Sequence, residues 1–148
     1  LVLPYDPVRD RVLIVEQVRI GAWGRGDLCP WQLEPIAGRI DGGESPEQAA
    51  RREALEETGL TLQSLKLIGQ AYPTPGTSTE YYFMYVAIMD LPDDVTGVHG
   101  LHSEAENIRS HLVDFAQLDK YAEALQLSNL ALLNMTHWLG RNREALRA

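Results

Sequence analysis

The chain has 148 residues, of which 45% are hydrophobic and 23% are charged, a composition typical of one globular domain with its own core. The formal net charge of −8 argues against nucleic-acid binding, because no basic surface is available to release counterions from phosphates. The longest apolar run, residues 81–89, has the length of a strand, and Cys29 is the only cysteine, so neither a membrane span nor an internal disulfide is expected.

The first part of the chain predicts a hairpin, a loop and a further strand. Residues 1–3 are apolar and are expected to stop at Pro4, with a turn at residues 6–10 and a strand at residues 11–18. Residues 21–30 are rich in glycine and are expected to form a loop. A strand at residues 31–37 then leads into Gly38.

Residues 46–58 are predicted to form a helix with well-defined ends. Ser45 is a favourable N-cap, Pro46 suits the first helical position, and Gln48 completes a capping box. Gly59 suits the residue just past the helix, where the backbone turns left-handed. These signals fix which residues of the helix share a face.

The second part of the chain predicts further strands followed by two helices. Strands are expected at residues 62–71, 80–89 and 108–113, with loops at 73–79 and 90–106. Asp114 is expected to cap a helix that ends near Leu125, and Ser128 is expected to cap the last helix. Strands that precede and follow a helix along the chain, together with helices at its C-terminal end, predict an α+β fold. We expect one domain of residues 1–148 with a mixed sheet between helices.

The segment GRIDGGESPEQAARREALEETGL, residues 38–60, concentrates acidic side chains. Glu53 lies three residues before Glu56 and four before Glu57, so all three share one face of the predicted helix, and Glu44 lies in the loop before it. Like charges at these spacings repel one another, and a divalent cation is the natural way to hold them together. Hard oxygen ligands favour Mg²⁺, or Mn²⁺, over zinc. Within the same segment, Arg52 can neutralise a neighbouring carboxylate, most simply that of Glu56.

The spacing G-x5-E-x7-R-E-U-x-E-E-x-G-U, where U is aliphatic, resembles the Nudix box of the Nudix hydrolases. It matches at every defining position: Gly38, Glu44, Arg52, Glu53, Ala54, Glu56, Glu57, Gly59 and Leu60. The resemblance implies a Nudix α/β/α sandwich and hydrolysis of a nucleoside diphosphate linked to another moiety, with magnesium held on the helix.

Pro75 lies fifteen residues after Leu60, in the segment PGTSTE, and this loop resembles that of the ADP-ribose pyrophosphatases. Thr77 departs from the pattern, because the subfamily usually has a second glycine there. The resemblance implies hydrolysis of ADP-ribose to AMP and ribose 5-phosphate. A nucleotide-sugar diphosphatase of the GDP-mannose type is the alternative substrate class. A non-catalytic, nucleotide-sensing Nudix domain is the alternative of another class, and the intact box disfavours it.

The resemblance also implies roles for particular residues. Two or three ions are expected to be held by the carbonyl of Ala37 and by Glu53, Glu56, Glu57 and Glu106. The expected catalytic residues are Glu104 as general base, Glu56 and Arg52, although the order of Glu104 and Glu106 stays open, and His99 and His102 are rival bases. The expected substrate contacts are Arg19, Pro75, Ser78 and Glu80. The single cysteine makes a reducing, cytoplasmic compartment the expectation. The resemblance further implies a homodimer with an additional segment before Leu1.

Overall fold

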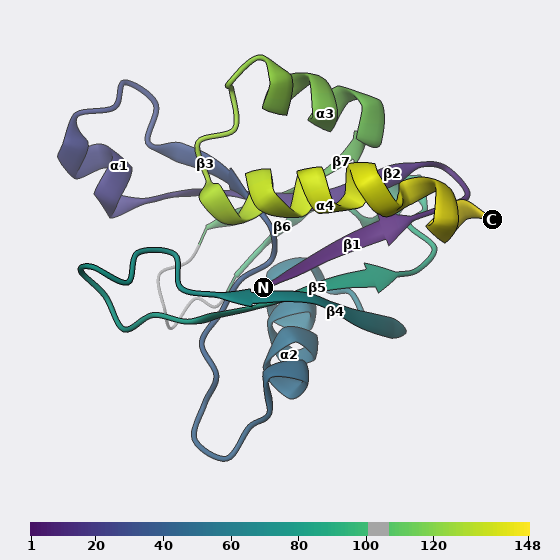
Figure 1. Ribbon diagram of the computed structural model, residues 1–148, viewed down its shortest axis with the longest axis horizontal. Helices are drawn as coiled ribbons and strands as arrows, with labels where there is room; N and C mark the ends of the chain where they lie inside the picture. The colour runs from purple at the N-terminus through teal and green to yellow at the C-terminus, as the bar shows by residue number, and fades with distance from the viewer. Residues whose placement is uncertain (101–106) are drawn as a thin grey trace.

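The computed structural model describes residues 1–100 and 107–148, and these residues form a seven-stranded mixed sheet between helices (Figure 1). The strands are β1 Val2–Asp6, β2 Arg11–Val18, β3 Trp31–Glu34, β4 Ser64–Ala71, β5 Tyr82–Ile88, β6 Val98–His99 and β7 Ile108–Asp114. The helices are α1 Ile20–Arg25, α2 Pro46–Thr58, α3 Phe115–Glu123 and α4 Leu130–Arg147, with a 3₁₀ turn at Asp93–Val95.

The sheet is mixed because β1 runs parallel to β5 while every other pairing is antiparallel. The order is β4-β5-β1-β2-β7-β6, with β3 also paired to β2. Along one edge, β2 pairs first with β1, at Tyr5 and Val12, and further on with β3, at Val18 and Trp31. A bridge between Val2 and Ile36 links the start of β1 to the segment after β3. The segment that leads into α2 therefore runs alongside the start of β1.

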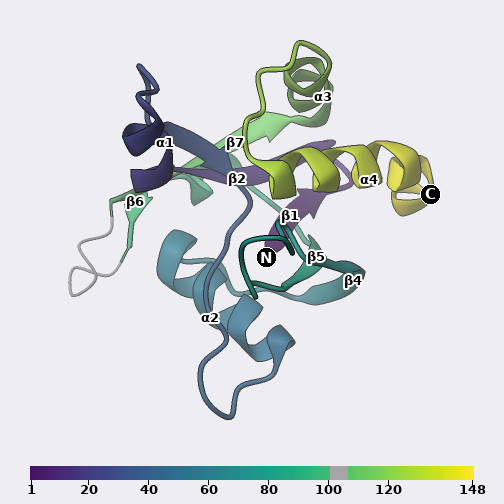
Figure 2. The ribbon, with the colours of Figure 1, turned by 60° about the vertical axis from the view of Figure 1, so that its left-hand side comes forward.

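Helix α2 covers one face of the sheet, and α3 and α4 cover the other (Figures 1 and 2). Alternation along β2 divides the buried core between these layers. Leu13 and Val15 pack with Ala54 of α2, whereas Val12 and Ile14 pack with residues of α3 and α4. The α/β/α sandwich predicted from the sequence is confirmed.

One expectation near the start of the chain is wrong, because Pro4 does not end the first strand. β1 continues through Pro4 to Asp6, and Pro4 pairs with Ala87 of β5. Backbone N–H groups two residues apart point to the same side of a strand, and the N–H of Val2 points to Ile36, away from β5. Pro4 is two residues after Val2, so its nitrogen points to this same side, away from β5. On this side, β1 pairs with β2 only from Tyr5 onward, so the N–H that proline lacks would have had no partner in the sheet.

Two further expectations need correction. The glycine-rich segment after β2 contains the short helix α1, none of whose residues is buried, and Gly26 ends it in the left-handed conformation with φ 90°. The last helix is capped by Asn129, whose side chain accepts a hydrogen bond from the N–H of Leu132 at 2.9 Å. Ser128 instead donates its hydroxyl to the side chain of Gln32 at 2.5 Å. Among the described residues, no helix combines the length and apolar character needed to cross a membrane.

Candidate active site

The ends of α2 are built as the sequence predicts. The hydroxyl of Ser45 accepts from the N–H of Gln48 at 3.2 Å, and the side chain of Gln48 accepts from the N–H of Ser45 at 2.8 Å. At the other end, Gly59 has φ 72° and donates its N–H to the carbonyl of Leu55 at 2.9 Å. The helix therefore spans Pro46–Thr58, and Glu53 and Glu57 project from one face toward the loop that precedes it.

The loop and the helix meet most closely at Gly38. A Cβ atom at Gly38 would lie 1.8 Å from Cδ and 1.9 Å from Oε1 of Glu53, so the Glu53 carboxylate occupies the space that any other side chain would need. One residue earlier, the N–H of Ala37 donates to Oε2 of Glu57 at 3.3 Å, and Glu57 is 2% exposed. Two carboxylates of α2 thus lie against the backbone of two consecutive loop residues.

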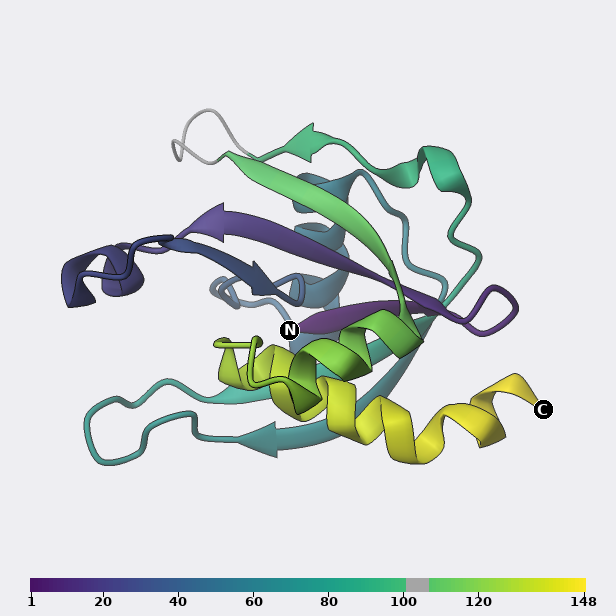
Figure 3. The same cartoon turned by 90° about the horizontal axis from the view of Figure 1, so that it is seen from above.

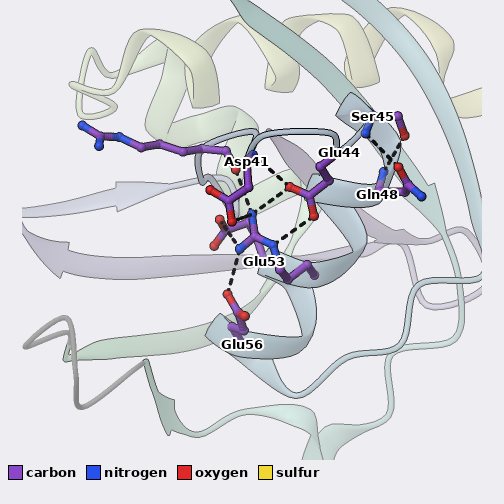
Figure 4. Close-up of polar contacts among 8 residues, drawn as sticks. Asp41, Glu44, Ser45, Gln48, Glu53 and Glu56 are labelled. Atoms are coloured by element: carbon purple, nitrogen blue, oxygen red, sulfur yellow. Dashed lines mark hydrogen bonds and ion pairs between the residues drawn. The ribbon is translucent and has the colours of Figure 1, made fainter.

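Arg52 lies among the remaining acidic side chains of this region, and Figure 4 shows Glu44, Glu53 and Glu56 directed toward one guanidinium group. Its Nε donates to Glu44 at 3.0 Å, and its Nη1 donates to Glu53 at 2.8 Å and to Glu56 at 3.0 Å. The predicted pairing with Glu56 is present, and the pairings with Glu44 and Glu53 add to it.

These contacts shift the protonation equilibria of the partners. Hydrogen bonds from Arg52, supported by one from the N–H of Asp41, hold the pKa of Glu44 below its ordinary value of 4.5. The same carboxylates, Glu44 most of all, raise the pKa of Arg52. Glu44 is therefore ionised at neutral pH, and Arg52 neutralises part of the charge of the carboxylates that surround it.

The donor set fits a hard divalent cation. Within residues 1–100 and 107–148, no group of three or more His, Cys, Asp or Glu side chains is gathered as a ready-made metal site. Glu53 and Glu56 instead face the Arg52 guanidinium, while Glu57 lies against Ala37. Carboxylate and carbonyl oxygens are the ligands that Mg²⁺ and Mn²⁺ prefer, so a cation held here would compete with Arg52 for its ligands.

A cleft of about 890 Å³ opens beside these carboxylates. Arg19 lines it and forms a forked pair with Glu34, with Nε 2.8 Å from Oε1 and Nη2 2.5 Å from Oε2. Glu34 is 3% exposed, so this pair holds the Arg19 side chain against the wall of the cleft. Glu34 was not among the residues predicted for the site, although a carboxylate placed between the apolar residues Leu33 and Pro35 is the sequence signal that points to it.

The structure brings together several of the predicted site residues and leaves others apart. The predicted residues that line the cleft are Arg19, Ala37, Glu53, Ser78 and Glu80. Pro75 is not among the lining residues, and His99 lines a separate hollow with Gly59 at the end of α2. Glu104, Glu106 and the rival base His102 lie outside the described residues. The cleft also has lining residues that sequence reasoning missed: Glu34, Tyr81, Tyr82, Phe83 and Asn129.

Comparison with known proteins is consistent with this geometry. The profile of the NUDIX domain family matches residues 1–133. The chain is similar to an ADP-ribose pyrophosphatase of Escherichia coli (strain K12), with 39% identity over 147 residues, 99% of this chain and 69% of that protein. It is similar to a GDP-mannose pyrophosphatase of Yersinia pestis (strain Pestoides F), with 32% identity over 103 residues, 70% of this chain and 52% of that protein. A solved structure described as an ADP compounds hydrolase has the same fold, with a TM-score of 0.70 and 23% identity over 96% of this chain and 74% of that one.

Proposed function

The chain belongs to the Nudix family, and we propose that it is an enzyme that hydrolyses the diphosphate linkage of ADP-ribose to AMP and ribose 5-phosphate. The observation that carries the proposal is the contact between α2 and its preceding loop. Glu53 fills the space beside Gly38, and Glu57 accepts from the N–H of Ala37, at the edge of a cleft large enough for a nucleotide.

Enzymes of this family generally use a divalent metal ion. We infer that two or three Mg²⁺ ions, replaceable by Mn²⁺, are held by Glu53, Glu56, Glu57, Glu106 and the carbonyl of Ala37. When bound, such ions neutralise the charge of a diphosphate and lower the pKa of water. The net charge of −8 makes this neutralisation necessary, because the protein alone would repel an anionic substrate.

The side chains have complementary roles in this proposal. Glu104 removes the proton from the attacking water, and Arg52 orients Glu44 and Glu56 around the acidic cluster. Arg19 has its guanidinium fixed by Glu34 and serves as a charged contact for a phosphate or ribose oxygen. Ser78 and Glu80 lie along the cleft, where a hydroxyl and a carboxylate suit the hydroxyl groups of ribose.

GDP-mannose is the second candidate substrate, because a GDP-mannose pyrophosphatase is also similar to this chain. ADP-ribose is favoured because the similarity to an ADP-ribose pyrophosphatase extends over 99% of the chain, against 70% for the GDP-mannose enzyme. The test compares kcat/KM for the two substrates in the presence of Mg²⁺, with EDTA as the control. A higher kcat/KM for ADP-ribose is expected. A preference for GDP-mannose overturns the substrate assignment, and tight binding of either nucleotide without any turnover favours a sensor.

We also propose that the protein acts as a homodimer in the cytoplasm. The support for the dimer is an exposed apolar surface around α1, where Ile20 is 77% exposed, Trp23 65% and Leu28 105%. Isolated domains rarely leave large apolar side chains exposed together unless the surface is used. Light scattering at several protein concentrations tests the dimer, and a monomeric mass throughout contradicts it.

A further inference from the structure

The loop before α2 brings a second arginine to the cleft, beside the acidic side chains. Arg39 follows Gly38 directly, is exposed, and lines the cleft together with Ala37 and Glu53. Within residues 1–100 and 107–148, the guanidinium group of Arg39 has no hydrogen-bond or ion-pair partner. Arg39 therefore adds a positive charge to the cleft that no carboxylate of the described residues neutralises.

The other arginines near this part of the cleft are engaged by carboxylates. Arg19 is held in a forked pair by the buried Glu34. The guanidinium group of Arg52 donates to three acidic side chains, those of Glu44, Glu53 and Glu56. Arg39 differs from both in that its side chain is free to take the position that a ligand requires.

The backbone of Arg39 is fixed, although its side chain is not. Its carbonyl accepts a hydrogen bond from Nη2 of Arg52 at 2.8 Å. Two residues earlier, the N–H of Ala37 donates to Glu57 at 3.3 Å. The Arg39 side chain therefore starts from a defined point next to the carboxylates that are proposed to hold the metal.

A diphosphate is the chemical group that suits this position. A guanidinium group offers paired N–H donors that match two phosphoryl oxygens, and its charge is retained at every physiological pH. The cleft lies at the end of the sheet from which α1 and the loop between β4 and β5 project, and its acidic lining side chains are Glu34, Glu53 and Glu80 (Figure 3). In a protein of net charge −8, an unneutralised cation at this place attracts an anion that the rest of the cleft repels.

We propose that Arg39 is a substrate-binding residue that donates hydrogen bonds to the phosphoryl oxygens of the diphosphate and determines affinity for that group. This inference rests on the proposed function for the identity of the substrate. It adds a contact that the recognised motif does not contain, because the residue after Gly38 is one of the five unspecified positions of G-x5-E.

Inorganic pyrophosphate is the direct probe, because it carries the diphosphate without a base or a sugar. Calorimetry with Mg²⁺ present measures its Kd for the wild type and for Arg39→Gln and Arg39→Lys. Arg39→Gln is expected to weaken binding about tenfold, or ~1.4 kcal/mol, in the range of a charge-assisted hydrogen bond. Arg39→Lys should lose less, because it keeps the charge but not the paired donors.

Arg141→Gln is the matched control for the loss of one positive charge. Arg141 is exposed on α4, lines neither of the two hollows, and its side chain likewise has no hydrogen-bond or ion-pair partner in the described part of the chain. Its variant should bind pyrophosphate as the wild type does. Equal pyrophosphate affinity in Arg39→Gln and Arg141→Gln overturns the inference, and so does a wild type that does not bind pyrophosphate.

The affinity for Mn²⁺ separates a direct contact from damage to the acidic cluster. Arg39→Gln should bind Mn²⁺ at least as tightly as the wild type, because it removes a positive charge near the cation. A loss of Mn²⁺ affinity that parallels the loss of pyrophosphate affinity contradicts a direct contact. Because these measurements need no turnover, they decide the role of Arg39 even if the wild type fails to hydrolyse ADP-ribose, a result that would refute only the proposed function.

Discussion

Replacing Gly38 with alanine tests how closely the loop must fit against α2, the helix proposed to bind the metal. The new methyl group would lie 1.8 Å from Cδ of Glu53, whereas ordinary van der Waals contact begins near 3.4 Å. The carboxylate must therefore withdraw by about 1.6 Å, and a displacement of about 1 Å at a catalytic group can cost on the order of 100-fold in rate. We expect kcat/KM for ADP-ribose to fall by roughly that factor.

Stability should change little in the same variant. The atoms that would clash with the methyl group belong to the end of a flexible side chain, which can move without disturbing the core. Alanine also restricts the unfolded chain, which stabilises a protein by ~0.4–1 kcal/mol at a compatible site. The assay therefore combines kcat/KM, Mn²⁺ affinity and the thermal midpoint Tm. We expect kcat/KM and Mn²⁺ affinity to fall while Tm stays nearly unchanged.

Gly42→Ala is the matched control, because Gly42 lies in the same loop and a Cβ there would have no atom within 4 Å. It should retain wild-type activity and metal affinity. Equal activity in the Gly38→Ala and Gly42→Ala variants would refute the reasoning, because it would mean that the position of the Glu53 carboxylate does not matter.

Substitutions at four other residues test separate parts of the site. Glu104→Gln should lower kcat with little change in Mn²⁺ affinity, and if Glu106→Gln has that effect instead, the roles of general base and metal ligand are exchanged. Arg52→Gln should lower the urea midpoint at pH 7 by removing the pairing with Glu44. Because Arg52 lowers the pKa of Glu44, the stabilisation is present above pH 4.5 and is lost as the pH falls through the lowered pKa; a difference in urea midpoint that is independent of pH would contradict this. Ser45→Ala should cost ~1 kcal/mol in urea unfolding without changing KM, and an unchanged urea midpoint would show that the cap is dispensable.

Local signals in the sequence predicted α2 well because each end depends on residues next to it. Ser45 and Gln48 begin the helix and Gly59 ends it, and the spacing of Glu53 and Glu57 then follows from helix geometry. The mixed sheet was also predictable from the order of strands and helices. That β1 continues through Pro4 was not predictable from the sequence. It depends on which strand pairs with β1 at that position, and this is a property of the assembled sheet.

Other features of the site depend on contacts between distant segments. Glu34 and Arg19 are fifteen residues apart and meet because β3 folds back on β2. The edge-to-face contacts of the cleft residue Tyr81 with Tyr72 and Phe83 depend on the register of β4 and β5, which sequence spacing across a loop does not specify. The close approach of Glu53 to Gly38 likewise needs the loop and the helix in their folded places, although the glycine itself is part of the recognised motif.

The proposal that the carboxylates of α2 hold the catalytic metal is tested most sharply by Glu57→Gln, because Glu57 is the buried one of the three. The substitution keeps the shape of the side chain and an oxygen that can accept from the N–H of Ala37, while removing the charge that a cation requires. The measurement is release of AMP and ribose 5-phosphate from ADP-ribose across a Mg²⁺ titration, with Tm recorded for both proteins. Mg²⁺-dependent turnover is expected to be abolished, and Tm is expected to stay near the wild-type value. Retained turnover together with a large fall in Tm would contradict it.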